Sequence, residues 1–230
     1  MCLRWVRLQM YRIEEYEEAI LLTELAIEII DELINKNKIN SFVFRLILQY
    51  SNLSNIYFKT GDLNRATNLR KEIMDYLFRG HCSLSPPSLK DVDLWEEMEF
   101  IREYNAIYYF KTTVDRINYF KNKDLNTYNQ LFNKTIKQFM DIEIMTLERY
   151  YLVNWIKVEC EFVNQNTLEF FSSIEIFFED GINSFFKFLA VYILESMELI
   201  PDINIPNESL KSLTLKFQNI DEDLFHKKQL

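Results

Sequence analysis

Glycine, proline and cysteine are scarce in this sequence, whose 230 residues include 3 glycines, 4 prolines and 3 cysteines. All-β proteins turn roughly every 8–12 residues and build many of those turns from glycine and proline, so their scarcity argues against a sheet-rich fold. The cysteines, Cys2, Cys82 and Cys160, are widely spaced and form no CxxC pair. This spacing argues against a disulfide scaffold or a cysteine zinc site, and it favours a reducing compartment.

Excess positive charge and long apolar runs are also missing. The formal net charge is −9, whereas a nucleic-acid-binding protein needs a basic surface, so we expect no direct contact with nucleic acid. The most apolar run, residues 185–200, is interrupted by Lys187, Glu195 and Glu198 and is shorter than the roughly 20 residues that cross a bilayer. The N-terminus shows no secretory signal. We expect a cytoplasmic protein that does not contact a membrane.

Signatures of catalysis are absent as well. The sequence contains no glycine-rich phosphate loop, nucleophile elbow or HExxH motif. His81 and His226 are the only histidines, and neither has further metal ligands at a useful spacing. Acidic neighbours such as Glu96 and Glu97 point roughly 100° apart on a helix, so they do not converge on one proton or metal ion. We expect no enzymatic activity, no cofactor and no metal site.

What the sequence does contain is helical periodicity along most of its length. In residues 19–34, apolar side chains recur every three or four positions and acidic side chains occupy the opposite face, as in an amphipathic helix. The one obvious break is at residues 80–91, where two prolines forbid a helix. The remaining helices are predicted at about 41–58, 63–78, 91–121, 124–140, 143–164, 167–179, 182–199 and 207–218. The pattern predicts an all-α protein.

A short segment of the sequence is duplicated. Residues 57–66 read YFKTGDLNRA and residues 119–128 read YFKNKDLNTY, with six of ten positions identical. Weaker copies lie at residues 162–171 and 10–19. In each copy an aromatic-ended helix meets a polar corner and a new helix begins. We expect a left-handed glycine at the first corner, and we expect the following helices to be capped by Asp62, Asp124 and Thr167.

The unit at residues 50–73 resembles a tetratricopeptide repeat. The residues that match the spacing of that family are Tyr50, Leu53, Ser54, Tyr57, Gly61, Ala66 and Ile73. Small side chains at Ser54 and Ala66 would let the paired helices approach closely. Arg70 departs from the pattern, because a large apolar residue is usual there. The corners are spaced by 47, 62 and 43 residues, instead of the 34 residues of the family.

The resemblance implies an irregular α-solenoid of four to five helical hairpins. We expect a single domain over residues 1–220, in which 1–79 is the part most similar to the family, 80–91 is a loop and 92–220 holds divergent repeats, followed by a frayed tail at 221–230. An irregular helical bundle with one chance match is the alternative. A first helix that carries Trp5 so close to the N-terminus would lack a covered outer face, which implies self-association through that helix or a preceding domain.

The resemblance also implies a concave face lined by the first helix of each hairpin. The polar residues at its inner positions, and so the predicted peptide-binding residues, are Ser51, Asn55, Lys59, Thr113, Lys121 and Asn164. Asparagine suits this position, because its amide can pair with both N–H and C=O groups of a peptide backbone. The aromatic residues Tyr104, Tyr108 and Tyr109 either line a second groove or fill the space between irregular repeats.

Two functions follow from this interpretation. The first is a module that binds a peptide or protein segment without catalysis. The second is the peptide-sensing half of a transcription regulator, because residues 150–162, YYLVNWIKVECEF, are similar to a helix of the Rgg and PlcR group. Those regulators carry a helix-turn-helix before the solenoid, and we expect no room for one in this chain.

Overall fold

The computed structural model describes residues 15–37, 42–80, 99–179 and 186–201. These residues contain helices and no strand, which confirms the all-α class. The elements are α2 (Tyr16–Asn37), α3 (Val43–Thr60), α4 (Leu63–Arg79), α6 (Glu99–Lys121), α7 (Leu125–Thr135), the 3-10 helix η3 (Lys137–Asp141), α8 (Leu147–Val163), α9 (Thr167–Phe177) and α10 (Lys187–Met197). Their bounds follow the predicted ranges closely, except that the range 124–140 divides into α7 and η3, and the predicted helix starts at residues 91 and 182 lie outside the described residues.

Several predictions fall outside the described residues. These are the N-terminal helix around Trp5, most of the loop at 80–91, the helix at 207–218 and the tail at 221–230. The described part of the chain includes no helix long and apolar enough to cross a membrane.

The chain divides into two compact units, residues 1–116 and 117–230, and the boundary falls within α6. The single domain over residues 1–220, with a loop at 80–91, stays a prediction.

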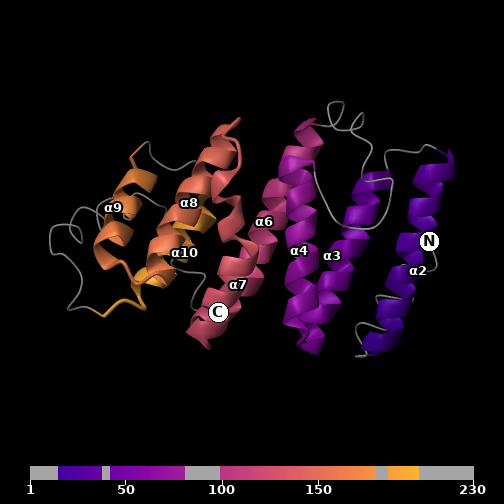
Figure 1. Cartoon of the computed structure of the whole chain (residues 1–230), viewed down its shortest axis with the longest axis horizontal. Coiled ribbons are helices and arrows are strands. Elements are labelled where there is room, and N and C mark those ends of the chain that lie inside the picture. Colours follow the sequence, from indigo (N-terminus) through magenta and orange to yellow (C-terminus); the bar gives the residue numbers. More distant parts are fainter. Residues whose placement is uncertain (1–14, 38–41, 81–98, 180–185, 202–230) are drawn as a thin grey trace. The chain divides into compact units, whose positions relative to one another are not determined.

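In the first unit, α2, α3 and α4 lie side by side (Figure 1). The corner between α3 and α4 forms as predicted. Gly61 adopts a left-handed conformation with φ 82°, which costs glycine little because it has no Cβ. The Asp62 carboxylate then caps α4 by accepting a hydrogen bond from the Arg65 backbone N–H at 3.0 Å.

The α3–α4 hairpin is closely packed at the two small residues. Ser54 and Ala66 are fully buried, and the Ser54 hydroxyl donates a hydrogen bond to the Ala66 carbonyl at 3.0 Å. Leu53 and Tyr57 complete the cluster around Ala66, and Ile20 of α2 packs against it. The contact therefore joins all three helices.

Ala66→Leu should lower the free energy of unfolding by about 1–3 kcal/mol, because the larger side chain overpacks this contact. Urea titration followed by far-UV circular dichroism measures the change. Asn68→Leu is the matched control, since Asn68 is exposed on the same helix, and its effect should stay within about 0.5 kcal/mol. Equal stability of the two variants would contradict the predicted packing.

In the second unit, α8 packs against α9, α10 and η3. Trp155 of α8 is fully buried, and its ring contacts those of Phe132 and Tyr192 with centroids 6.3 and 5.9 Å apart. Aromatic side chains fill much of the core of this unit. Of the three tyrosines for which a groove or a packing role was predicted, Tyr109 is buried, whereas Tyr104 and Tyr108 are exposed.

The two later corners differ in how the next helix is capped. Asp124 caps α7 as predicted, by accepting a hydrogen bond from the Thr127 backbone N–H at 3.2 Å. Hydrogen bonds from Thr127 also lower the pKa of the Asp124 carboxyl. The prediction for Thr167 is wrong, because Thr167 is the first residue of α9 and Asn166 precedes it as N-cap without a side-chain cap. Asn166 donates instead to the Glu161 carboxylate at 2.8 Å.

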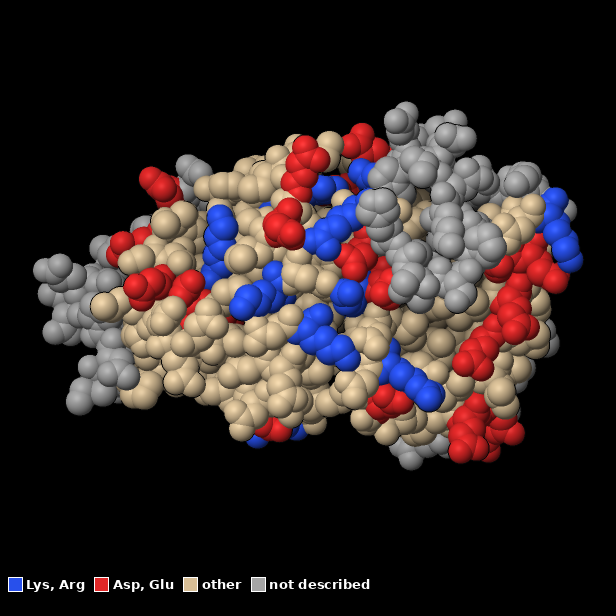
Figure 2. Space-filling view, in the orientation of Figure 1, with Lys and Arg blue, Asp and Glu red and all other residues tan. Residues whose placement is uncertain are grey.

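The predicted acidic face of α2 lies on the surface. Figure 2 shows acidic side chains gathered where α2 lies in Figure 1. The exposed ones are Glu17, Glu18, Glu24, Glu28 and Glu32. The periodicity of residues 19–34 therefore predicted that these acidic side chains meet solvent, and the apolar side chains of Leu21, Leu25 and Ile29 are exposed as well.

Candidate ligand-binding site

An open cavity of about 340 Å³ lies in the first unit. It is lined by Ser51, Asn55, Arg70, Tyr108, Thr112, Asp115 and Arg116. Residues from α3, α4 and α6 therefore contribute to one cavity, and every lining residue is polar or aromatic. Such a lining suits a polar ligand better than an aliphatic one.

Arg70 forms the buried part of this cavity and is only 2% exposed. Its Nε donates to the Ser54 hydroxyl at 3.1 Å, its Nη1 to the Thr112 hydroxyl at 3.1 Å and its Nη2 to Asn55 Oδ1 at 2.8 Å. The guanidinium also lies 6.0 Å from the centroid of the Tyr109 ring. These contacts hold the guanidinium plane in one orientation.

All three hydrogen-bond acceptors of Arg70 are neutral oxygens. Burial removes the guanidinium from water and lowers the pKa of Arg70 to about 10, and repulsion by Arg116 acts in the same direction. Burial likewise raises the pKa of Tyr109 to about 12, so this neighbouring phenol is uncharged at neutral pH and does not compensate the cation. Arg70 is therefore a protonated, buried cation that has no carboxylate partner among the described residues. A buried charge is normally paired with an opposite charge.

The rim of the cavity carries charges of both signs. Arg116 is exposed there, and Asp115 forms an ion pair with Lys111 at 2.8 Å. The Tyr108 side chain is 52% exposed. At the rim, an entering ligand therefore meets Arg116, which has no ion-pair partner among the described residues, and the ring of Tyr108.

The structure brings together two of the six predicted peptide-binding residues, Ser51 and Asn55, in this cavity. Lys59 is exposed on α3 but does not line the cavity, and Asn164 is exposed at the C-terminal end of α8. Thr113 is fully buried, and its hydroxyl donates to the Tyr109 carbonyl at 2.6 Å. Thr113 is therefore not available to a peptide at the surface, contrary to the prediction.

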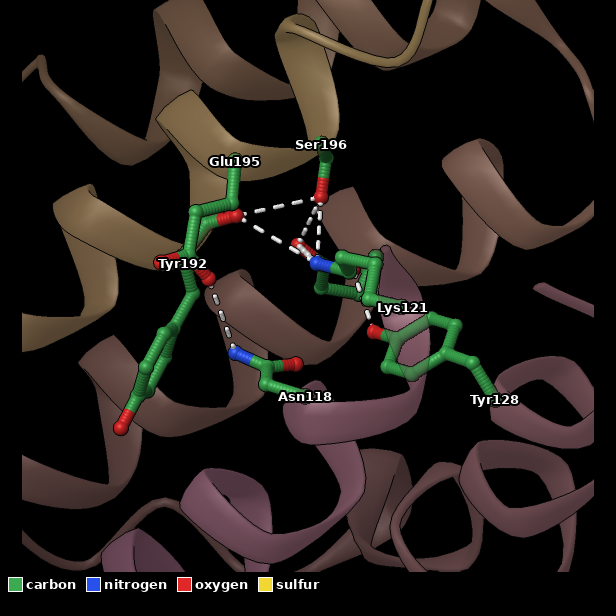
Figure 3. Close-up of polar contacts among 7 residues, drawn as sticks. Asn118, Lys121, Tyr128, Tyr192, Glu195 and Ser196 are labelled. Carbon is green, nitrogen blue, oxygen red and sulfur yellow. Dashed lines mark hydrogen bonds and ion pairs between the residues drawn. The ribbon is translucent and has the colours of Figure 1, made fainter. Parts of the chain in front are cut away.

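The prediction for Lys121 also needs correction, because this residue is buried in the second unit (Figure 3). Its ammonium lies 2.9 Å from Glu159 Oε2 and 2.6 Å from the Ser196 hydroxyl. Tyr128 donates a hydrogen bond to the same carboxylate at 2.7 Å, and burial followed by the Glu159 charge raises the pKa of Tyr128 well above its usual value. The ammonium of Lys121 is therefore occupied by an internal partner.

A lysine, a serine and a carboxylate in contact are also groups that occur in catalytic sites. Ser196 donates to Glu159 at 2.6 Å, so the three groups do form a connected network. However, the side chains of Lys121 and Glu159 are 0% exposed, so a substrate does not reach them in this structure. We interpret the network as a structural element of the second unit.

Sequence reasoning missed Arg70 as a functional candidate, although it noted Arg70 as a departure from the repeat pattern. The sequence did point to Arg70, because a charged side chain at a position that usually holds a large, buried apolar residue needs hydrogen bonds or an opposite charge. The identity of its partners could not be read from the sequence, since Thr112 lies 42 residues away. Among the described residues there is no cluster of histidine, cysteine and carboxylate side chains that could hold a metal ion.

No family model, curated protein or solved structure matches this chain. The class of the fold therefore rests on the helices themselves, and the interpretation of the cavity rests on its chemistry.

Proposed function

We propose that this chain is a non-enzymatic, cytoplasmic helical-repeat module that binds a peptide or protein segment. In this proposal the hairpins form an irregular solenoid of four to five units, and the cavity beside Arg70 holds part of the ligand. The observation that carries the proposal is the position of this cavity. It lies at the α3–α4 hairpin, the segment that resembles a tetratricopeptide repeat, and it includes Ser51 and Asn55.

Asn55 offers a specific contact to a peptide. Its Oδ1 accepts from Arg70 at 2.8 Å, so its amide nitrogen remains as a donor for a backbone carbonyl. Arg70 thereby fixes which end of the amide faces the ligand. A donor held in one orientation loses less conformational entropy on binding than a freely rotating side chain.

Asn55→Ala should weaken peptide binding by roughly 1–3 kcal/mol, the cost of one hydrogen bond at a partly buried site together with the group that it leaves unpaired. A peptide-array screen would identify ligands for the intact chain, and isothermal titration calorimetry would compare the variants. Asn133→Ala is the matched control, since Asn133 is exposed on α7 and is not a cavity residue. Failure of the intact chain to bind any peptide or protein segment would overturn the proposed function, whereas binding unaffected by Asn55→Ala would place the site elsewhere.

A further inference from the structure

The geometry points to a single carboxylate as the group that the Arg70 cavity binds. The carboxylate belongs either to a small organic acid or to a peptide, and only the second source rests on the proposed function. Arg70 lies outside the inner-face positions at which the resembling repeats contact peptides. The inference therefore comes from the cavity of this chain.

The cavity is lined by hydrogen-bond donors that have no partner among the described residues. A guanidinium has five N–H donors, and Arg70 uses three of them, on Ser54, Thr112 and Asn55. Because Nε has one N–H and each terminal nitrogen has two, one N–H on each terminal nitrogen remains. The amide nitrogen of Asn55 and the guanidinium of Arg116 also belong to the cavity. The lining is therefore richer in donors than in acceptors, as an oxyanion requires.

The lining carries charges of both signs. It contains two cations, Arg70 and Arg116, and one carboxylate, Asp115, which pairs with Lys111 at 2.8 Å. The two arginines favour an anion, and the Asp115 carboxylate repels any additional negative charge. A phosphate monoester carries about −1.5 to −2 at neutral pH, so Asp115 repels it more strongly than it repels a singly charged group. A carboxylate carries a single charge and matches the planar fork of arginine.

The size of the cavity limits what it can hold. A volume of about 340 Å³ lies near the lower end of the roughly 300–1,000 Å³ range of small-molecule pockets. It accommodates a small acid or one end of a longer ligand. The half-exposed ring of Tyr108 gives the ligand an apolar contact next to the donors. An aromatic acid such as benzoate is therefore a suitable probe.

The net charge of the chain decides which contacts must supply affinity. At −9, the chain as a whole repels an anion, so binding of benzoate requires direct contacts within the cavity. Changes at cavity residues should therefore affect binding, whereas equal changes of charge elsewhere should not.

The test is calorimetric titration of the intact chain with benzoate, with benzamide as its neutral counterpart and with inorganic phosphate. We expect benzoate to bind, and benzamide and phosphate to bind at least tenfold more weakly. Arg70→Met should abolish binding of benzoate, and Arg116→Gln should weaken it about tenfold, the effect of one charge-assisted hydrogen bond. Arg116 is exposed at the rim, so this variant keeps the test independent of folding.

Arg45→Gln is the matched control, because Arg45 is exposed on α3 and does not line the cavity. Its affinity for benzoate should equal that of the unmodified chain. Equal binding of benzamide, tighter binding of phosphate, or equal loss of binding in Arg45→Gln and Arg116→Gln would overturn the inference.

A second set of titrations identifies the source of the carboxylate. Peptides that bind the chain are remade with an amidated C-terminus or with each acidic side chain changed to its amide. A tenfold loss of affinity for one of these peptides assigns the carboxylate to the peptide. Binding of benzoate by a chain that binds no peptide assigns the carboxylate to a small acid, and it rejects the proposed function alone. If peptides bind, but neither the amide changes nor the Arg70 and Arg116 variants weaken this binding, the inference is rejected and the proposed function stands.

Discussion

Lys121→Met should lower the free energy of unfolding by about 3–5 kcal/mol, because it leaves the Glu159 carboxylate buried without its cation. Both side chains are 0% exposed in the native chain, so water does not replace the lost partner. The hydrogen bonds from Tyr128 and Ser196 remain, but neither group carries a positive charge. Urea titration followed by far-UV circular dichroism measures the loss.

The charge origin of this effect predicts a rescue. Replacing Glu159 as well, in Lys121→Met with Glu159→Gln, should recover part of the lost stability, because the amide carries no charge that is left buried without a partner. The same urea titration compares the single and the double variant.

Lys59→Met provides the control for this prediction, because it removes the same charge from an exposed position on α3. Its effect should stay within about 0.5 kcal/mol. A loss below about 1 kcal/mol in Lys121→Met would contradict the buried ion pair and reopen the prediction that Lys121 faces a ligand.

Trp155→Ala should lower the free energy of unfolding by about 3–5 kcal/mol, the usual cost of truncating a large buried aromatic residue. Trp155 is fully buried between Phe132 and Tyr192, and the backbone of α8 cannot collapse into the space without disturbing its contacts with α9 and α10. The same urea titration measures the change. Leu168→Ala is the control in the same unit, since the Leu168 side chain is 69% exposed, and a similar loss in both variants would contradict the described core.

Two of the buried cations, Arg70 and Lys121, differ in how their charge is compensated. Lys121 has a carboxylate, a hydroxyl and a carbonyl as partners, so its charge is compensated inside the protein. Arg70 has only neutral partners and lies beside an open cavity. These partners explain the burial of Lys121 by a structural role, whereas the contacts of Arg70 support the proposed carboxylate ligand.

The sequence alone determined the features that depend on neighbours along the chain. The helical periodicity of residues 19–34, the left-handed Gly61 and the caps at Asp62 and Asp124 each depend on residues within about one helical turn, so the sequence predicted them. The third corner shows the limit of such local reasoning. There Asn166 pairs with Glu161 instead of capping α9.

Tertiary structure alone decided the surroundings of the charged residues. Both Arg70 and Lys121 occur in amphipathic helices whose pattern allows either exposure or burial. Their partners, Thr112 and Glu159, lie 42 and 38 residues further along the chain, and no periodicity specifies such a pairing. Desolvation and charge compensation depend on every helix that packs around a group. For this reason Lys121, predicted to bind a peptide, forms an internal ion pair, and Arg70, which departs from the repeat pattern, lines the cavity.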